Sequence, residues 1–252
     1  MILGIPNETP YDLKFNIGPV PVRVHPLFWV LGLVFGGMQG SQGPQMFVDM
    51  LTWVVVIFIS ILVHELGHVY AFSYFGLRSR VSLYMMGGLA IPEQSGYSQR
   101  VGPKENIIIS AAGPIAGFLL AGLVLLLAMT TGATVGLGVL FDKIPFPYVA
   151  AQVGAPQFWS GFLNGMITIN ILWGVLNLFP LFPLDGGQIA RSIFQIFDPI
   201  NAVPRSLMLS VATGALLAFW GFSTGSIWNG VLFGSLAYSS WQMLQAGGRG
   251  RY

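Results

Sequence analysis

Two histidines and a glutamate lie within five residues in the stretch His64-Glu65-Leu66-Gly67-His68. Positions four apart lie on the same face of a helix, so the imidazoles of His64 and His68 can bind one metal ion together. Glu65 lies one position further round the helix, beside that metal rather than bound to it. Two imidazole ligands with an adjacent carboxylate are typical of zinc hydrolases, in which the glutamate takes a proton from the water at the metal. The spacing therefore predicts a hydrolytic zinc site.

The surroundings of this motif strengthen the prediction. The chain has three histidines, and two of them fall here, inside the apolar segment 47–75. An acidic side chain near the centre of a bilayer costs about 2.5–3.5 kcal/mol, and for that reason it usually has a function. The alternative interpretation is a pair of buried polar residues that bridge neighbouring helices.

The composition indicates an integral membrane protein. Of the 252 residues, 54% are hydrophobic and 8% are charged, and the mean hydropathy is +0.71. Soluble domains carry about 25% charged residues, so this chain lacks the polar groups to cover its own surface in water. Because there is no cysteine, disulfides are excluded and any zinc ligands must be nitrogen or oxygen atoms. We expect a lipid bilayer as partner, no nucleic acid, and no cleavable signal peptide in the first 24 residues.

Six apolar segments predict an all-α polytopic membrane protein with about six transmembrane helices. These segments are residues 26–38, 47–75, 106–131, 158–179, 205–222 and 227–244. We expect one membrane-embedded domain over residues 1–252. Within it we expect an extended N-terminal segment (1–25), a catalytic core (47–200) and two C-terminal helices (205–245).

Three connecting segments have their own predicted structure. Residues 80–92 read as a small membrane-associated β-hairpin, two short strands around Gly87-Gly88. Non-helical backbone at membrane depth must be sheltered by protein or line a wet cavity, so this hairpin is expected to be sheltered in that way. Residues 131–156 read as a loop, and residues 188–197 as a short interfacial helix.

The basic residues predict the orientation of the chain. With six spans both termini lie on one side of the membrane, and ten of the eleven Lys and Arg residues fall on that side; Lys143 alone falls on the other. Lys and Arg are in excess on the cytoplasmic side of membrane proteins. We therefore expect cytoplasmic termini and a cytoplasmic active-site side, in a prokaryotic cell membrane.

A catalytic zinc ion takes three protein ligands and leaves one position open for water. Of the nine acidic residues, only Asp185 lies in a broken membrane segment, among prolines and glycines on the same half of the membrane as His68. We expect Asp185 to be the third ligand, and its charge together with that of Glu65 would balance Zn²⁺ in a low-dielectric site. The alternative is an aspartate that caps a helix beginning at Gly186. His25 also offers a nitrogen, but its place before a proline is typical of a surface or capping histidine.

Three motifs together resemble the site-2 protease family of intramembrane zinc metalloproteases, in the family's order and over about residues 20–200. They are His64-Glu65-x-x-His68, Gly113-Pro114-x-x-Gly117 and Asn177-x-x-Pro180-x-x-Pro183-Leu184-Asp185-Gly186. The resemblance implies that His64, His68 and Asp185 bind one Zn²⁺ per chain and that Glu65 is the general base. It also implies that Asn177 stabilises the developing oxyanion. The alternative is that Asn177 has a structural role and caps the break. The glycine-proline motif would pack beside the metal helix, and the strands of residues 80–91 would pair with an unwound substrate.

The resemblance implies an endopeptidase that cleaves transmembrane segments of substrate membrane proteins. No loop is long enough for a PDZ-like or CBS-like insert, so we expect a compact member. Gln188 stands where related compact members often have Arg. A prenyl-processing zinc protease would need a glutamate as third ligand, and no spare one lies in a span. The non-enzyme alternative is a zinc-binding membrane protein or transporter-like relative, but binding alone would not require the base Glu65.

Overall fold

The computed structural model describes residues 7–85, 87–93, 101–140, 144–150 and 157–249, so that Lys143 lies outside the described residues. Helices make up most of the chain. The chain divides into two compact units. The sheet unit holds residues 5–95 and 113–174, and the C-terminal unit holds residues 1–4, 96–112 and 175–252.

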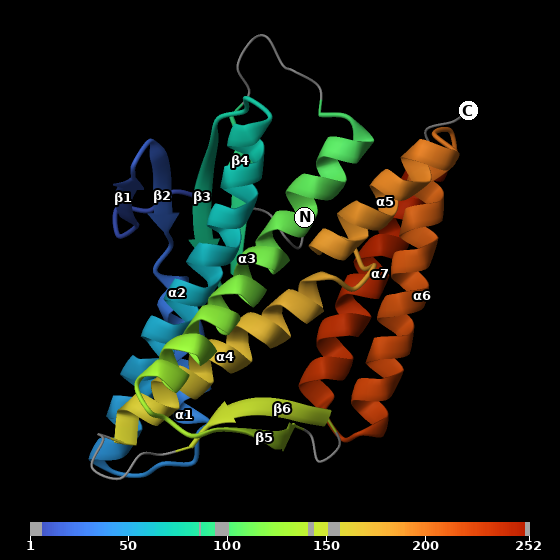
Figure 1. The fold of residues 1–252 in the computed structure, drawn as a ribbon. Helices are drawn as coiled ribbons and strands as arrows, with labels where there is room; N and C mark the ends of the chain where they lie inside the picture. The colour runs from blue at the N-terminus through green and yellow to red at the C-terminus, as the bar shows by residue number, and fades with distance from the viewer. Residues whose placement is uncertain (1–6, 86, 94–100, 141–143, 151–156, 250–252) are drawn as a thin grey trace. The chain divides into compact units, whose positions relative to one another are not determined.

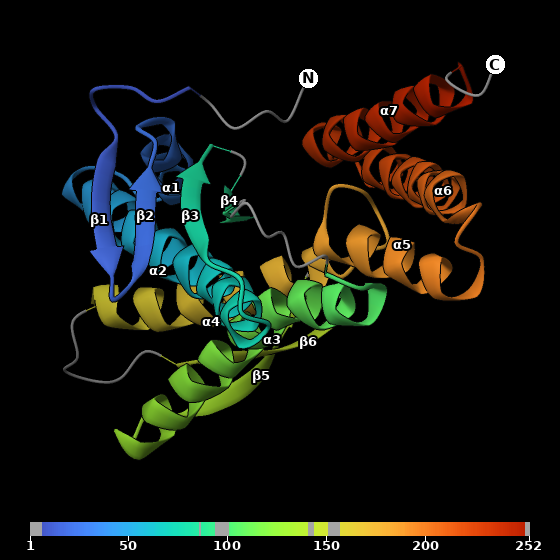
Figure 2. The ribbon, with the colours of Figure 1, turned by 90° about the horizontal axis from the view of Figure 1, so that it is seen from above.

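A four-stranded sheet is the main non-helical part of the sheet unit. Its strands are β1 (Leu13–Ile17), β2 (Val20–Val24), β3 (Ser79–Tyr84) and β4 (Gly87–Pro92), in the order β1-β2-β3-β4. β1 and β4 run antiparallel to their neighbours, while β2 pairs with β3 in parallel. Figure 2 shows β1, β2 and β3 side by side. The hairpin predicted for residues 80–92 is thus confirmed, and the N-terminal segment extends it into a larger sheet.

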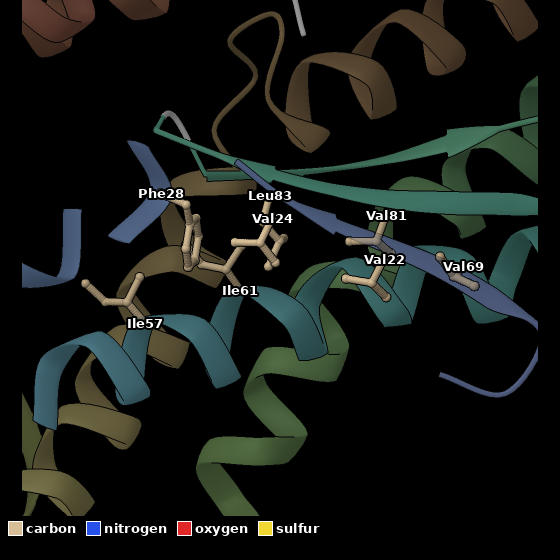
Figure 3. Packing of buried hydrophobic residues seen from close by; sticks show 8 residues of the cluster. All are labelled: Val22, Val24, Phe28, Ile57, Ile61, Val69, Val81 and Leu83. Atoms are coloured by element: carbon tan, nitrogen blue, oxygen red, sulfur yellow. The ribbon is translucent and has the colours of Figure 1, made fainter. Parts of the chain in front are cut away.

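One face of this sheet packs on α2 (Pro44–Tyr74), the helix that carries the histidine motif. Alternate residues of β2 and β3 point toward the helix, as Figure 3 shows. The buried cluster consists of Val22, Val24, Phe28, Ile57, Ile61, Val69, Val81 and Leu83. Burying an aliphatic or aromatic side chain of this size is worth about 1.5–3 kcal/mol. The cluster therefore holds the strands firmly against the helix that carries the motif.

The short helix α1 (Leu27–Gly37) packs against the N-terminal half of α2 (Figure 1). Its contact face is made of glycines four residues apart. A Cβ atom added at Gly32 would lie 2.6 Å from the Cα atom of Val54, and one at Gly36 would lie 2.8 Å from the carbonyl oxygen of Asp49. Small residues at this spacing let two helix backbones approach closely in a membrane.

A second hairpin occupies part of the segment predicted as a loop, so that prediction was wrong. β5 (Val135–Leu140) and β6 (Ile144–Val149) pair in antiparallel. The side-chain amide of Asn164 donates to the Val149 carbonyl and accepts from its N–H, both at 2.8 Å. This link joins β6 to α4 (Gln157–Asn177) across a stretch of sequence, so no local pattern predicts it. The prolines within β6 favour a loop when the sequence is considered alone.

The C-terminal unit contains three helices after a break in the chain. They are α5 (Asp185–Phe197), α6 (Ala202–Ser223) and α7 (Ile227–Arg249). Figure 1 shows α6 and α7 side by side. Leu181, from the break before α5, is fully buried against this pair, with Ala218, Phe233 and Leu236. The break is therefore anchored on the α6–α7 pair.

Among the residues that the structure describes, four helices are long and apolar enough to cross a membrane: α2, α3 (Pro103–Thr130), α4 and α6. Large apolar side chains on their outer surfaces are exposed, such as Leu119 and Leu126 of α3, which suits a hydrocarbon solvent. α1 is about 16 Å long, about half the thickness of a hydrocarbon core. Four of the six predicted spans are thus supported by length and composition, and the count of six stays a prediction.

Replacing Gly36 by alanine should force α1 away from α2, because the new methyl group would collide with the backbone at Met50. We expect a loss of about 1–3 kcal/mol of stability, as for other overpacked contacts. Thermal unfolding of the detergent-solubilised protein measures this. Gly37→Ala is the matched control, because its Cβ would meet only the flexible ends of the Met50 and Met46 side chains, at 3.2 Å and 3.8 Å. Equal melting temperatures for the two variants would contradict the proposed close contact.

Candidate metal centre

The two motif histidines converge on one point on the face of α2. His64 and His68 are 3% and 7% exposed. Their Nε2 atoms lie 3.3 Å apart, with the rings tilted at 79° to each other. Two nitrogen ligands of a tetrahedral zinc ion, each at 2.0–2.1 Å from it, lie about 3.3–3.4 Å apart. The imidazole pair therefore fits the spacing of two zinc ligands.

Gly113 of α3 leaves the space that these imidazoles occupy. A Cβ atom added there would collide with His68 Nε2 and would lie 2.8 Å from His64 Nε2. The sequence predicted a helix-packing role for Gly113-Pro114-x-x-Gly117. Gly117 has such a role, since its Cβ would lie 3.3 Å from the Asn170 carbonyl oxygen of α4. Gly113 does something more specific, because it keeps the coordinating nitrogens free of a side chain.

The carboxylate of Glu65 lies against the first residues of β4. Glu65 is 4% exposed, and a Cβ atom added at Gly88 would lie 2.6 Å from Glu65 Oε1. Gly87, at a φ of +120°, adopts a conformation that L side chains rarely take. Sequence reasoning placed Gly87-Gly88 in a turn and so missed this contact. The available signal was a glycine within a strand, which often marks a close backbone approach.

Tyr84, at the end of β3, belongs to the same neighbourhood. Its burial, together with the negative charge of Glu65, raises the pKa of the phenol. Tyr84 is therefore a neutral hydroxyl near the carboxylate at any pH close to neutral. Nothing in its sequence context indicated this position.

Asp185 is the first residue of α5. The residue before it, Leu184, holds the N-cap position and makes no side-chain cap bond. The alternative interpretation of Asp185 as the cap of a helix beginning at Gly186 is therefore wrong, because the helix begins at Asp185 itself. A carboxylate in the first turn is stabilised by the unpaired N–H groups and the helix dipole.

The break before α5 is tightly folded around its two glycines. A Cβ atom at Gly186 would collide with the Leu178 carbonyl, and one at Gly187 would lie 2.6 Å from the Phe182 nitrogen. The Phe182 N–H donates to Ser210 Oγ of α6 at 3.0 Å, which gives one of the freed backbone groups a partner. Asn177, the last residue of α4, is 7% exposed at the start of this break. The fold of the break thus sets where Asn177 and Asp185 lie on their unit.

The three predicted ligands come from both units: His64 and His68 belong to the sheet unit, and Asp185 belongs to the C-terminal unit. Each residue of this group offers one ligand atom, an imidazole nitrogen from each histidine and a carboxylate oxygen from the aspartate. Two imidazole nitrogens and a carboxylate oxygen suit zinc. His25 is not in this group. It is buried at the start of α1, where its Nδ1 accepts a bond from the Leu27 N–H at 3.2 Å, so it caps the helix.

The chain matches Peptidase family M50 over residues 52–219. It is 27% identical over 197 residues to a zinc metalloprotease of Methanocaldococcus jannaschii, covering 73% of this chain and 46% of that protein. It is 28% identical over 218 residues to a putative zinc metalloprotease of Synechocystis, covering 82% and 50%. It is 26% identical over 204 residues to the stage IV sporulation protein FB of Bacillus subtilis, covering 79% and 57%. The chain spans about half the length of these relatives.

The fold is also similar to a solved structure. The site-2 protease from Methanocaldococcus jannaschii matches with a TM-score of 0.57 and 19% sequence identity. The match covers 93% of this chain and 95% of that one. Both chains therefore share a fold over nearly their whole lengths.

Adding one methyl group at Gly113 should weaken metal binding. Gly113→Ala places a carbon where His68 Nε2 and His64 Nε2 now converge, so the imidazoles must separate. We expect zinc affinity to fall about 10- to 100-fold, the range for changes beside ligating histidines. Titration of the chelator-treated protein with zinc measures the change. Gly122→Ala on the same helix, with no atom within 4 Å of the new Cβ, should bind as the parent does; unaltered affinity in both variants would contradict the role of Gly113.

Proposed function

Because this chain belongs to peptidase family M50, we propose that it is a zinc-dependent intramembrane endopeptidase that cleaves a transmembrane segment of another protein. The observation that carries the proposal is the buried imidazole pair of His64 and His68 on a helix long and apolar enough to span a membrane. Relatives named zinc metalloproteases support the metal and the reaction class.

In this proposal His64, His68 and Asp185 hold the zinc ion. The distance between the two imidazole nitrogens and the donor set of the three residues support it. Zinc supplies Lewis acidity, which makes water a nucleophile near neutral pH and polarises a peptide carbonyl. The carboxylates of Asp185 and Glu65 together balance the charge of Zn²⁺, so the site is neutral in a setting of low dielectric.

Glu65 moves the proton in this reaction. Its carboxylate accepts a proton from the water that attacks the scissile carbonyl carbon, and then delivers that proton to the leaving amide nitrogen as the C–N bond breaks. The contact with Gly88 keeps the carboxylate from turning away toward β4. Asn177 is proposed to donate its side-chain N–H to the oxyanion that develops on the carbonyl oxygen.

β4 is the proposed docking strand for the substrate. It is an edge strand of the four-stranded sheet, and Gly88 on this strand lies against the general base. A substrate helix must first unwind, because its own hydrogen bonds and side chains cover the carbonyls. An extended segment added to an edge strand gains main-chain hydrogen bonds that offset the loss.

The site belongs to an integral membrane protein, as the four apolar helices and the family indicate. We place the catalytic core at residues 47–200 of one membrane-embedded domain, with a bilayer and a membrane-protein substrate as partners. We also place the protein in a cell membrane, with both termini and the active-site side in the cytoplasm.

Glu65→Gln should keep one bound zinc per chain and lose cleavage, because the amide cannot act as a base while the ligands remain. The expected loss in rate is about 10²- to 10⁴-fold. Metal analysis and cleavage of single-span substrates, with and without a chelator, measure both properties. His68→Ala is the contrasting variant and should lose zinc as well as activity. Normal turnover in Glu65→Gln would show that Glu65 is not the base. A wild-type protein that keeps zinc but cleaves no substrate would favour the alternative of a zinc-binding or transporter-like protein.

The orientation has a separate test, since the native chain has no cysteine. Phe197→Cys and Leu137→Cys each place a thiol at an exposed position, on opposite sides of the membrane by the six-span prediction. A membrane-impermeant maleimide on intact cells should label the cysteine at position 137 at once and the one at position 197 only after permeabilisation. The reverse pattern would place the active-site side outside the cytoplasm.

A further inference from the structure

The face of the four-stranded sheet that points away from α2 carries a basic cleft of about 390 Å³. Cross-strand pairing explains how it forms. Lys14 of β1 pairs with Arg23 of β2, and Arg23 pairs with Ser82 of β3. These residues alternate with the valines and leucines of the buried cluster, so their side chains lie on the opposite face. The cleft is lined by Glu8, Lys14, Phe15, Asn16, Pro21, Val22, Arg23, Arg80, Val81, Ser82 and Ile91.

Two of the three cations in the cleft are already paired. Lys14 Nζ lies 2.5 Å from Glu8 Oε2, and Arg23 Nε lies 2.6 Å from Asp12 Oδ2. Burial alone would raise the pKa of Asp12, but hydrogen bonds from Thr9 and Arg23 outweigh it and lower the pKa to about 2. The Asp12 carboxylate is therefore ionised throughout the physiological range and neutralises Arg23.

Arg80 is the third cation, and it is exposed at the rim of the cleft. Across the part of the chain that the structure describes, it has no carboxylate within ion-pair distance. The cleft thus retains one uncompensated positive charge.

A buried hydroxyl lies in the floor of the same cleft. Ser82 is 3% exposed, and its Oγ has no hydrogen-bond partner among the described residues. It alternates with Val81 and Leu83, both of which belong to the buried cluster on α2. Its hydroxyl therefore points to the cleft side, between Arg23 and the β4 strand. An unsatisfied buried hydroxyl costs about 1–3 kcal/mol, so a ligand that accepts its hydrogen bond would be stabilised.

We propose that this cleft binds the phosphodiester of a phospholipid head group. A phosphodiester carries one negative charge, which matches the single uncompensated charge of Arg80. Its oxygens can accept a bidentate pair of bonds from the guanidinium and one bond from Ser82. Leu13 and Ile17 on β1 are large, apolar and exposed, and they alternate with Lys14, so they lie on the opposite face of this edge strand from the cleft. The acyl chains of the bound lipid would pass round the edge of the sheet to reach them. The sheet would thus be held at the membrane surface by its own lipid.

The test measures lipid binding directly and needs no proteolysis, so it is independent of the proposed enzyme activity. Detergent-solubilised protein is titrated with dioctanoyl phosphatidylglycerol, and bound lipid is counted by native mass spectrometry. Arg80→Ala should weaken binding about tenfold or more, and Ser82→Ala by a smaller factor of about three to ten. Arg78→Ala and Ser79→Ala should bind as the parent does, because neither residue lines the cleft.

Two further probes identify the source of the phosphate. Dioctanoylglycerol has the same acyl chains without a phosphate and should not bind in an Arg80-dependent way. Inorganic phosphate should bind more weakly than the lipid and compete with it. The proposal is overturned if dioctanoylglycerol binds as well as the phospholipid, or if inorganic phosphate binds equally tightly with the same dependence on Arg80. It is also overturned if only an acidic peptide binds with that dependence, or if Arg80→Ala leaves lipid binding unchanged.

Discussion

The Nε2 atoms of His64 and His68 meet at 3.3 Å inside an apolar environment, and much of the structure serves that arrangement. Polar nitrogens buried in a membrane segment are costly unless they have partners. One metal ion can satisfy both lone pairs at the distance at which the helix holds them. The neighbouring elements must therefore leave the coordinating side of the pair open while they shield it from lipid. Gly113 of α3 does so by contributing backbone without a side chain.

The same solution occurs wherever two backbones must approach closely. Gly36 lets α1 reach α2, Gly88 lets β4 reach the Glu65 carboxylate, and Gly186 lets the first turn of α5 fold onto the preceding break. Helices in a membrane gain little from the hydrophobic effect when they associate, so close packing contributes much of the attraction. Each of these glycines is thus tied to a particular neighbour, and a single methyl group at any of them displaces the element that it contacts.

The four-stranded sheet combines two environments in one small element. Its inner face completes a core with α2, and this contact brings β4 to the Glu65 carboxylate. Its outer face carries Lys14, Arg23 and Arg80 around a cleft. Alternation along the strands separates the two sets of side chains without any additional element. A sheet of this kind can lie beside a membrane helix and still present charge to the polar side of the interface.

The sequence by itself determined the metal chemistry and most of the helices. A spacing of four places His64 and His68 on one helical face whatever surrounds them, and the apolar segments required helices because backbone groups in lipid must bond within the segment. The predicted and observed bounds of α2, α3, α4 and α6 agree within three residues. Asp185 could be selected by its chemistry, because few other carboxylates lie in an apolar segment.

Only the tertiary structure decided which backbones pass close to these side chains. The parallel pairing of β2 with β3, the Asn164 link that orders β6, and the contacts of Gly88 and Gly113 join residues far apart in the chain. Such contacts leave no periodic pattern in the sequence. The sequence alone does not distinguish a glycine in a turn from a glycine in a helix interface or beside a metal ligand. Local spacing therefore predicted what the site could bind, and long-range packing decided how much room the bound groups have.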